Sequence, residues 1–376
     1  MRSQFLSMGF RPFFLGAAGA AVALMGLWII FLLTGISTHE NLMPVLWHGH
    51  EMLFGFAMAV IAGFLLTAMQ NWTGLRLVTP GQLALLVAVW LAGRLAFAFS
   101  GVMPLWLISL LDLGFLPLLC LIVARTLIRA GNRRNYSLIA MLLIFWTLNI
   151  LMHLEFHYPS SGMAYLSLDV SVLLATTLLV FMGGRVIPFF TDRRLPGATP
   201  VQWPWLNWAS TLTVLALIPT YLIVGRDIML APLLLIAAVS TAGRLLAWKP
   251  WRTFGEPLLW ILHLGYAWVP VGLIFLAMHV SGTGLPWTAG IHALMAGAMS
   301  TLILGMMARV ALGHSGRPIT APPLMVAGFL IITIAAVSRV AAAMITPDWL
   351  LIAAALLWAL AFLIYLVVYT PIILRS

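Results

Sequence analysis

The chain has 376 residues, of which 63% are hydrophobic and 7% are charged, and its formal net charge at pH 7 is +10. A soluble domain carries about 25% charged residues, so the composition excludes a soluble protein. The apolar runs are about 20 residues long and do not alternate as barrel strands do, which indicates an all-α integral membrane protein. Cys120 is the single cysteine, which excludes an internal disulfide and a metal site with several thiolate ligands.

In chain order, twelve apolar segments are predicted to cross the bilayer as one bundle. Short loops join them, so residues 1–376 are expected to form a single polytopic membrane domain. Arg2 and Arg11 lead directly into a full-length first span, and we therefore expect no cleavable signal peptide. The predicted spans are 12–34, 47–69, 81–99, 105–128, 136–157, 164–190, 205–224, 228–247, 257–280, 286–312, 321–344 and 348–370.

The distribution of Lys and Arg predicts the orientation of these spans. The loops that follow odd-numbered spans contain only Arg226. By the positive-inside rule, both termini are therefore cytoplasmic, and the net charge requires no nucleic-acid partner. The N-terminus and the loops that follow even-numbered spans hold Arg2, Arg11, Arg76, Arg129, Arg133, Arg134, Arg193, Arg194, Lys249, Arg252 and Arg317.

The second and tenth spans repeat one pattern, in which a histidine is followed by glycines at identical offsets. At about 100° per residue, the first two glycines form a ridge of small residues roughly opposite the histidine. Such a ridge lets a neighbouring helix approach and leaves the histidine facing another partner. We interpret the two histidines as axial ligands of a haem in the outer leaflet; a hydrogen bond to a neighbouring carbonyl is the alternative. The two sets are His50, Gly55, Gly63 and Gly74, and His292, Gly297, Gly305 and Gly316.

Seven of the nine histidines are predicted to gather in the outer leaflet, which favours a metal or haem site there. His48 lies about 200° around the helix from His50, so either one could be a ligand while the other supports it. In the fifth span, Asn149 and His153 share one helix face with His157. We interpret His39, His157 and His279 as ordinary interfacial residues. The seven are His39, His48, His50, His153, His157, His279 and His292.

The two remaining histidines lie in the inner half. His263, which Tyr266 follows, is either a metal ligand or a plain hydrogen-bonded partner. His314 follows Arg309 at the cytoplasmic end of the tenth span, and we interpret it either as a helix cap or headgroup contact or as a haem-propionate site or point of proton entry.

Four arginines lie within or at the edge of apolar runs, where few carboxylates can pair with them. Asp112 and Asp169 are the main candidates. Arg94 in the third span suits the propionates of a bis-histidine haem, and structural contacts between helices are the alternative. The four are Arg94, Arg185, Arg244 and Arg339.

Five stretches resemble the signatures of the NnrS family: MGFRPFFLGAA, WHGHEMLFGFAMAVIAGFLLTAMQNWTG, GGRVIPFFT, HLGYAWVP and HALMAGAMSTLILGMMARVALGHSGRP. The resemblance extends from Phe10 to about Pro318. It implies a twelve-span protein of the bacterial inner membrane that contains haem and copper and takes part in denitrification and the response to nitric oxide. The matching positions are His48, His50, Glu51, Asn71, Trp72, Arg185, His263, Tyr266, His292, Arg309 and His314.

A more distant similarity links the chain to the catalytic subunits of haem–copper oxidases and nitric oxide reductases. Those subunits also have twelve spans and hold a low-spin haem through histidines on spans 2 and 10. Spans 6 and 7 here contain no histidine. The three-histidine copper centre of those enzymes is therefore absent, and reduction of oxygen or nitric oxide by their mechanism is not expected.

The first functional hypothesis is a membrane protein that binds haem b, and copper as a second metal, and handles electrons or nitric oxide in the outer leaflet. The haem is expected to be b-type because no CxxCH attachment motif is present. If the protein is an enzyme, it is an oxidoreductase acting on nitric oxide or a related nitrogen oxide. The alternatives are a multi-pass transporter and a haem-dependent assembly factor for respiratory enzymes. The expected partners are the lipid bilayer and nitric oxide or an electron donor.

Overall fold

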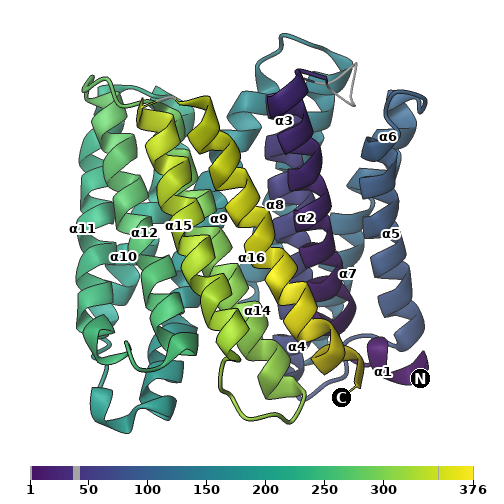
Figure 1. The fold of residues 1–376 in the computed structure, drawn as a ribbon, viewed down its shortest axis with the longest axis vertical. Helices are drawn as coiled ribbons and strands as arrows, with labels where there is room; N and C mark the ends of the chain where they lie inside the picture. The colour runs from purple at the N-terminus through teal and green to yellow at the C-terminus, as the bar shows by residue number, and fades with distance from the viewer. Residues whose placement is uncertain (1, 37–42, 346, 376) are drawn as a thin grey trace. The chain divides into compact units, whose positions relative to one another are not determined.

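The computed structural model describes residues 2–36, 43–345 and 347–375, so His39 lies outside the described residues (Figure 1). Within these ranges every regular element is helical. The prediction of a twelve-span helical membrane protein is confirmed. The helical segments long and apolar enough to cross a bilayer are Phe10–Thr34, Pro44–Thr73, Pro80–Ala98, Leu105–Arg129, Arg133–His157, Met163–Arg194, Pro204–Val224, Ile228–Arg252, Pro257–Val280, Trp287–His314, Pro323–Ile345 and Asp348–Arg375.

The chain packs as two compact units. Unit 1 comprises Met1–Ser171, His314–Gly316 and Tyr369–Ser376, and unit 2 comprises Val172–Gly313 and Arg317–Val368. These are units of internal packing, and the assignment of residues 1–376 to one membrane domain stays a prediction.

Unit 1 contains the N-terminal helices, in which α2 packs on α4, α5 on α6, and α7 on α8. Helix α9 (Met163–Arg194) begins in this unit and continues into unit 2. The other elements of unit 1 are α1 (Arg2–Phe5), α2 (Phe10–Thr34), α3 (Pro44–His50), η1 (Glu51–Ala57), α4 (Met58–Thr73), α5 (Pro80–Ala98), α6 (Leu105–Leu113), α7 (Phe115–Arg129), η2 (Arg133–Asn135) and α8 (Ser137–His157).

In unit 2, helix α12 packs against α11 on one side and against α13 and η6 on another, and α10 lies beside α11 (Figure 1). The elements of this unit that follow α9 are η3 (Pro196–Ala198), α10 (Pro204–Val224), η4 (Ile228–Leu230), α11 (Ala231–Ala247), η5 (Pro250–Arg252), α12 (Pro257–Val280), α13 (Trp287–His292), η6 (Ala293–Met299), α14 (Ser300–His314), α15 (Pro323–Ile345) and α16 (Asp348–Arg375). The ends of α14 and α16 belong to unit 1.

Local sequence explains where helices begin and end. Thr79 caps α5 through a capping box: its Oγ1 accepts from the Gln82 backbone N–H at 3.3 Å, and the Gln82 side chain accepts from the Thr79 N–H at 2.9 Å. Helix α4 ends at Gly74, whose φ of +69° is a left-handed conformation that glycine adopts without strain.

The repeated sequence pattern corresponds to a repeated structure. Helix α3 ends at His50 and α13 ends at His292, and in both copies the next seven residues form a π-helix, η1 and η6. A π-helix holds extra residues in each turn and is often found at functional sites. Because of this insertion, the 100° spacing used to place the glycines opposite the histidines does not apply within these segments.

Three of the six repeated glycines lie at close helix approaches. A Cβ on Gly297 would lie 2.6 Å from Trp268, and one on Gly305 would lie 2.9 Å from Ile261, so both glycines face α12. Gly63 faces α2 in the same way, with Phe13 at 2.9 Å. Gly55 differs, because its open side is filled by the side chains of Glu51 and Arg94 rather than by another helix backbone.

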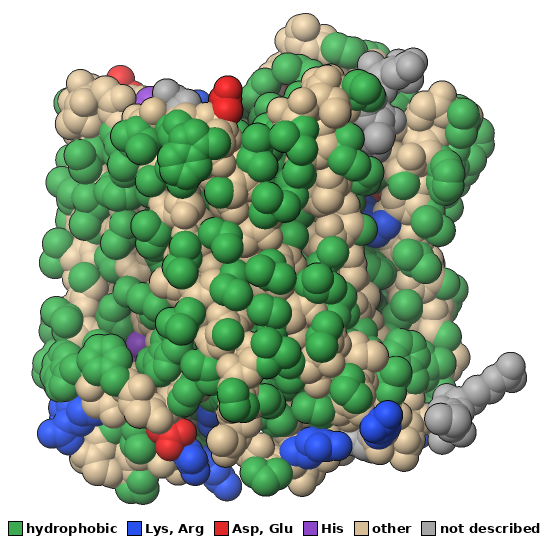
Figure 2. All heavy atoms as spheres, in the orientation of Figure 1, with side chains coloured by type: hydrophobic (Ala, Val, Ile, Leu, Met, Phe, Trp, Pro, Cys, Tyr) green, Lys and Arg blue, Asp and Glu red, His purple; other side chains and the backbone are tan. Residues whose placement is uncertain are grey.

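The outward side chains suit a lipid environment. Figure 2 shows hydrophobic side chains along the helices and Lys and Arg mainly near helix ends. Ile223 is 83% exposed and Val239 is 72% exposed, and such apolar residues are stable when they face lipid. The cytoplasmic location of both termini stays a prediction.

Candidate metal centre

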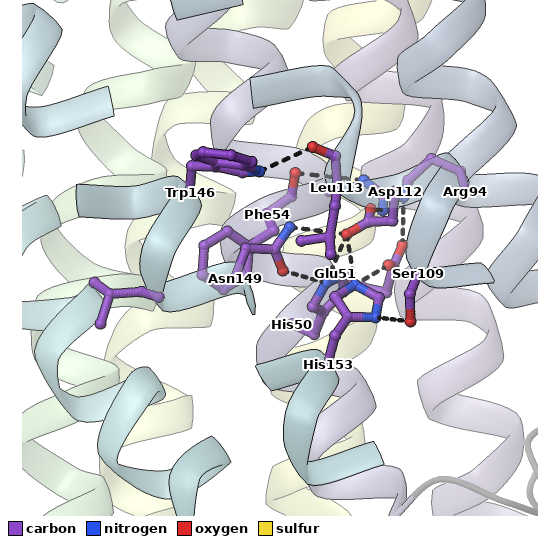
Figure 3. A network of polar contacts seen from close by, with 12 residues as sticks. His50, Glu51, Phe54, Arg94, Ser109, Asp112, Leu113, Trp146, Asn149 and His153 are labelled. Atoms are coloured by element: carbon purple, nitrogen blue, oxygen red, sulfur yellow. Dashed lines mark hydrogen bonds and ion pairs between the residues drawn. The ribbon is translucent and has the colours of Figure 1, made fainter. Parts of the chain in front are cut away.

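A cluster of polar side chains lies buried in unit 1, where four helical segments meet (Figure 3). His50 and Glu51 stand at the junction of α3 and η1. Arg94 comes from α5 and Asp112 from the end of α6. Asn149 and His153 come from one face of α8, as their i, i+4 spacing predicts. All six side chains are at most 8% exposed.

Three features of the chain place Asp112 in this cluster. Gly93 lets α5 approach α6, since a Cβ there would lie 3.1 Å from the Asp112 Cα. The helix is interrupted between Leu113 and Phe115. The Trp146 indole donates to the Leu113 carbonyl at 3.1 Å, which satisfies a backbone acceptor at this interruption.

His50, Asp112 and His153 each place one potential metal-ligating atom within 4.8 Å of the other two. The Asp112 Oδ2 lies 3.2 Å from His50 Nε2 and 2.9 Å from His153 Nε2. Asn149 closes the group: its Oδ1 is 2.9 Å from His50 Nε2, and its Nδ2 donates to Asp112 Oδ2 at 2.8 Å. Ligand atoms around a tetrahedral ion with bonds of about 2.0 Å stand about 3.3 Å apart. The separations of the two imidazole nitrogens from Asp112 Oδ2 lie near this spacing.

The charges of the cluster balance. Arg94 Nε is 2.9 Å from Glu51 Oε2, and its Nη2 pairs closely with Asp112 Oδ1. His50 faces an acceptor at each ring nitrogen, because Nδ1 lies 3.1 Å from Glu51 Oε1. When protonated, an imidazole placed between two acceptors donates from both nitrogens and carries a positive charge, and His50 has to lose the Nε2 proton before that atom can bind any metal. Two carboxylates therefore offset two cations, which lowers the cost of burying four charges at membrane depth.

A chain of hydrogen bonds continues from the cluster to the surface. His153 Nδ1 is 2.9 Å from Ser109 Oγ, which is 3.0 Å from Nε2 of the exposed His157. His157 was interpreted from the sequence as an ordinary interfacial residue. The structure instead connects it, through Ser109, to a side chain of the metal-ligating set.

The other predicted ligands lie outside this cluster. His48 stacks on Trp28 with ring centroids 4.3 Å apart, and His314 lies 5.8 Å from the Phe10 ring. In unit 2, Arg309 lies over the ring of Phe190 at 4.0 Å.

His263 and His292 belong to unit 2, and both are oriented by their own helices. The Nδ1 of His263 donates to the Leu259 carbonyl at 3.0 Å, and that of His292 donates to the Thr288 carbonyl at 2.7 Å. This bond fixes the tautomer that presents Nε2 as a potential ligand. The Nε2 of His263 has only a long contact of 3.5 Å, to Thr191 Oγ1.

These two histidines cannot ligate the same iron. Leu262, next to His263, packs against Gly305, which lies 13 residues beyond His292 on the adjoining helix. At 1.5 Å per residue, His263 and His292 therefore lie roughly 20 Å apart along the helix axes. The predicted pairing of His50 with His292 joins two different units and stays a prediction. For His50 to bind iron through Nε2, Asp112 and Asn149 would have to move away from that atom.

Sequence reasoning found part of this cluster. The Asn149–His153 stripe was recognised, and Asp112 was named as a partner for buried arginines, which its pairing with Arg94 confirms. Ser109 was missed, because a serine in an apolar span carries no distinguishing signal. Glu51 is one of the positions that match the NnrS signatures. Its contact with Arg94, however, depends on the π-helical turn that starts at this residue.

The model of the NnrS protein family matches residues 4–376, which is nearly the whole chain. No curated protein matches the chain.

Proposed function

Since this chain belongs to the NnrS family, we propose that it is a metal- and haem-binding membrane protein of the nitric oxide response. It works in the bacterial inner membrane with both termini in the cytoplasm. The observation that carries the proposal is the convergence of His50, Asp112 and His153 on one buried point.

Copper is the metal proposed for the cluster. Two imidazoles and a carboxylate oxygen suit a first-row metal, and copper binds most tightly in the divalent series. Asp112 would remain fixed by Arg94 on its other oxygen, and Asn149 would supply a further oxygen or orient the carboxylate. Such outer contacts hold ligands in place before the metal arrives.

Haem b is proposed to bind through His263 or His292, each with its Nδ1 already bonded to a backbone carbonyl. When bound, the haem supplies an iron that takes up nitric oxide or passes an electron. The chain contributes an imidazole whose orientation this bond fixes. At His263 it also contributes the ring of Trp248, whose centroid is 6.4 Å from that of the imidazole.

Metal analysis of the purified full chain tests the copper site. Wild type is expected to carry about one copper per chain, and His153→Ala is expected to lose copper affinity by about tenfold or more. Asp112→Asn should act in the same direction. His279→Ala is the matched control, because it removes an imidazole of unit 2 that donates to the Leu285 carbonyl and takes no part in the cluster.

Haem content is measured on the same samples. Loss of copper with haem retained supports two separate sites. Equal copper in wild type and His153→Ala would contradict the copper site, even where haem is present.

A further inference from the structure

A second buried polar cluster lies in unit 2 and takes no part in the metal centre. It is built by Arg244 on α11, Trp248 at the C-terminal end of that helix, and Tyr266 on α12. Arg244 is 4% exposed, and Trp248 and Tyr266 are 0% exposed. Two of the sequence stretches noted above, GGRVIPFFT and HLGYAWVP, meet here through Gly183 and Tyr266.

The guanidinium of Arg244 is held in place by neutral groups. Its Nη1 donates to the Val180 carbonyl at 3.0 Å and to Ser210 Oγ at 2.9 Å. Its Nη2 fills the space beside Gly184, where a Cβ would lie 1.1 Å away. No side chain can therefore replace the hydrogen at position 184 without displacing the arginine.

Arg244 forms no ion pair with a carboxylate in the described part of the chain. Its guanidinium carbon lies 5.3 Å from the Trp248 ring centroid. A positive charge at this depth is costly unless an anion offsets it.

Three hydrogen-bond donors around this charge have no partner among the described residues: Arg244 Nε, Trp248 Nε1 and the Tyr266 hydroxyl. The Trp248 and Tyr266 rings are in contact, with centroids 4.7 Å apart. Buried donors without acceptors destabilise a folded chain. One cation with three unpaired donors matches a ligand that carries one negative charge and several acceptor oxygens.

We propose that Arg244, Trp248 and Tyr266 form a binding site for a monovalent oxyanion, for which nitrite serves as the probe. The guanidinium supplies the charge, and the indole N–H and phenolic O–H donate to the oxygens. The same chemistry would accept a carboxylate carried by a larger molecule, such as a haem held at the nearby His263. The site does not depend on the copper centre or on the proposed role of His50.

Nitrite binding to the purified full chain tests the site. Sodium nitrite is titrated into the protein by isothermal calorimetry, with haem-loaded protein and with protein from cells unable to make haem. Tyr266→Phe is the decisive variant, since it keeps the ring and removes only the unpaired hydroxyl. Its nitrite affinity is expected to fall about tenfold, while its unfolding temperature without nitrite stays equal or rises. Arg244→Gln is expected to abolish binding.

Arg226→Gln is the matched control. Arg226 also lies over a tryptophan in unit 2, but that ring is Trp287, at 4.9 Å, rather than Trp248. Its nitrite affinity should equal that of wild type.

Nitrite binding in both preparations, weakened in Tyr266→Phe, supports a site for a free anion. Binding confined to the haem-free protein supports the same site with a haem carboxylate as its occupant. Absence of saturable binding in both preparations, or equal affinity in wild type and Tyr266→Phe, overturns the proposal.

Discussion

His50 Nε2 and Asp112 Oδ2 lie 3.2 Å apart although 62 residues separate them in the chain, and both side chains are almost completely buried. The contact joins the last residue of α3, where the π-helical turn begins, to the C-terminal end of α6. It makes His50 part of a network of paired charges. Its Nε2 contacts Asp112 and Asn149, so those contacts must break before this atom can bind iron.

Removing Arg94 should destabilise unit 1 because two carboxylates would then share one cation. Arg94→Gln is expected to lower the free energy of unfolding by about 3–5 kcal/mol, measured by denaturation in detergent micelles. The double variant Arg94→Gln, Glu51→Gln removes one charge of each sign and should recover part of the loss. Equal stability of the single variant and wild type would contradict the charge balance described here.

The repeated glycines should tolerate no side chain. Gly297→Ala would place a Cβ 2.6 Å from Trp268, so it is expected to cost about 1–3 kcal/mol through overpacking. Gly19→Ala is the control, because nothing lies within 4 Å of its Cβ position and a helical alanine stabilises by about 0.5–1 kcal/mol. Thermal unfolding of the two variants gives the comparison, and a Gly297→Ala variant as stable as Gly19→Ala would refute it.

The haem is expected to be b-type and held by oriented histidines. Acid–acetone should extract it, since the chain has one cysteine and no covalent attachment motif. His292→Ala or His263→Ala is expected to abolish haem retention or convert a low-spin spectrum to a high-spin one. His279→Ala should leave the spectrum unchanged.

The same spectra test the predicted pairing of His50 with His292. If the pair is axial, His50→Ala and His292→Ala should change the spectrum equally. A change in His292→Ala alone would assign His50 to the metal centre.

Nitric oxide turnover is expected to be slow or absent. Spans 6 and 7 contain no histidine, so the three-histidine metal centre of haem–copper oxidases and nitric oxide reductases is not expected, and a haem ligated by both His50 and His292 would have no open position. An electrode measures nitric oxide consumption by purified protein with a chemical electron donor. Steady consumption that is lost in His153→Ala or His263→Ala would show that the protein is an enzyme.

Composition and spacing alone determined the class of this protein, its twelve spans and the internal repeat. Apolar runs of bilayer length have few structural alternatives, because every backbone polar group must be satisfied within the segment in lipid. The i, i+4 spacing of Asn149 and His153 likewise needed only helical periodicity.

Only the tertiary structure decided which buried groups meet. The π-helical turns after His50 and His292 break the regular 100° spacing, and no local signal marks such an insertion. The Asp112 and Arg94 contacts depend on how α5, α6 and α8 pack around Gly93. The unpaired donors around Arg244 exist because Gly184 leaves room for a guanidinium. In the first cluster, close helix packing at Gly93 brings together charges that lie far apart in the chain, and in the second, Gly184 leaves the space that the guanidinium of Arg244 fills.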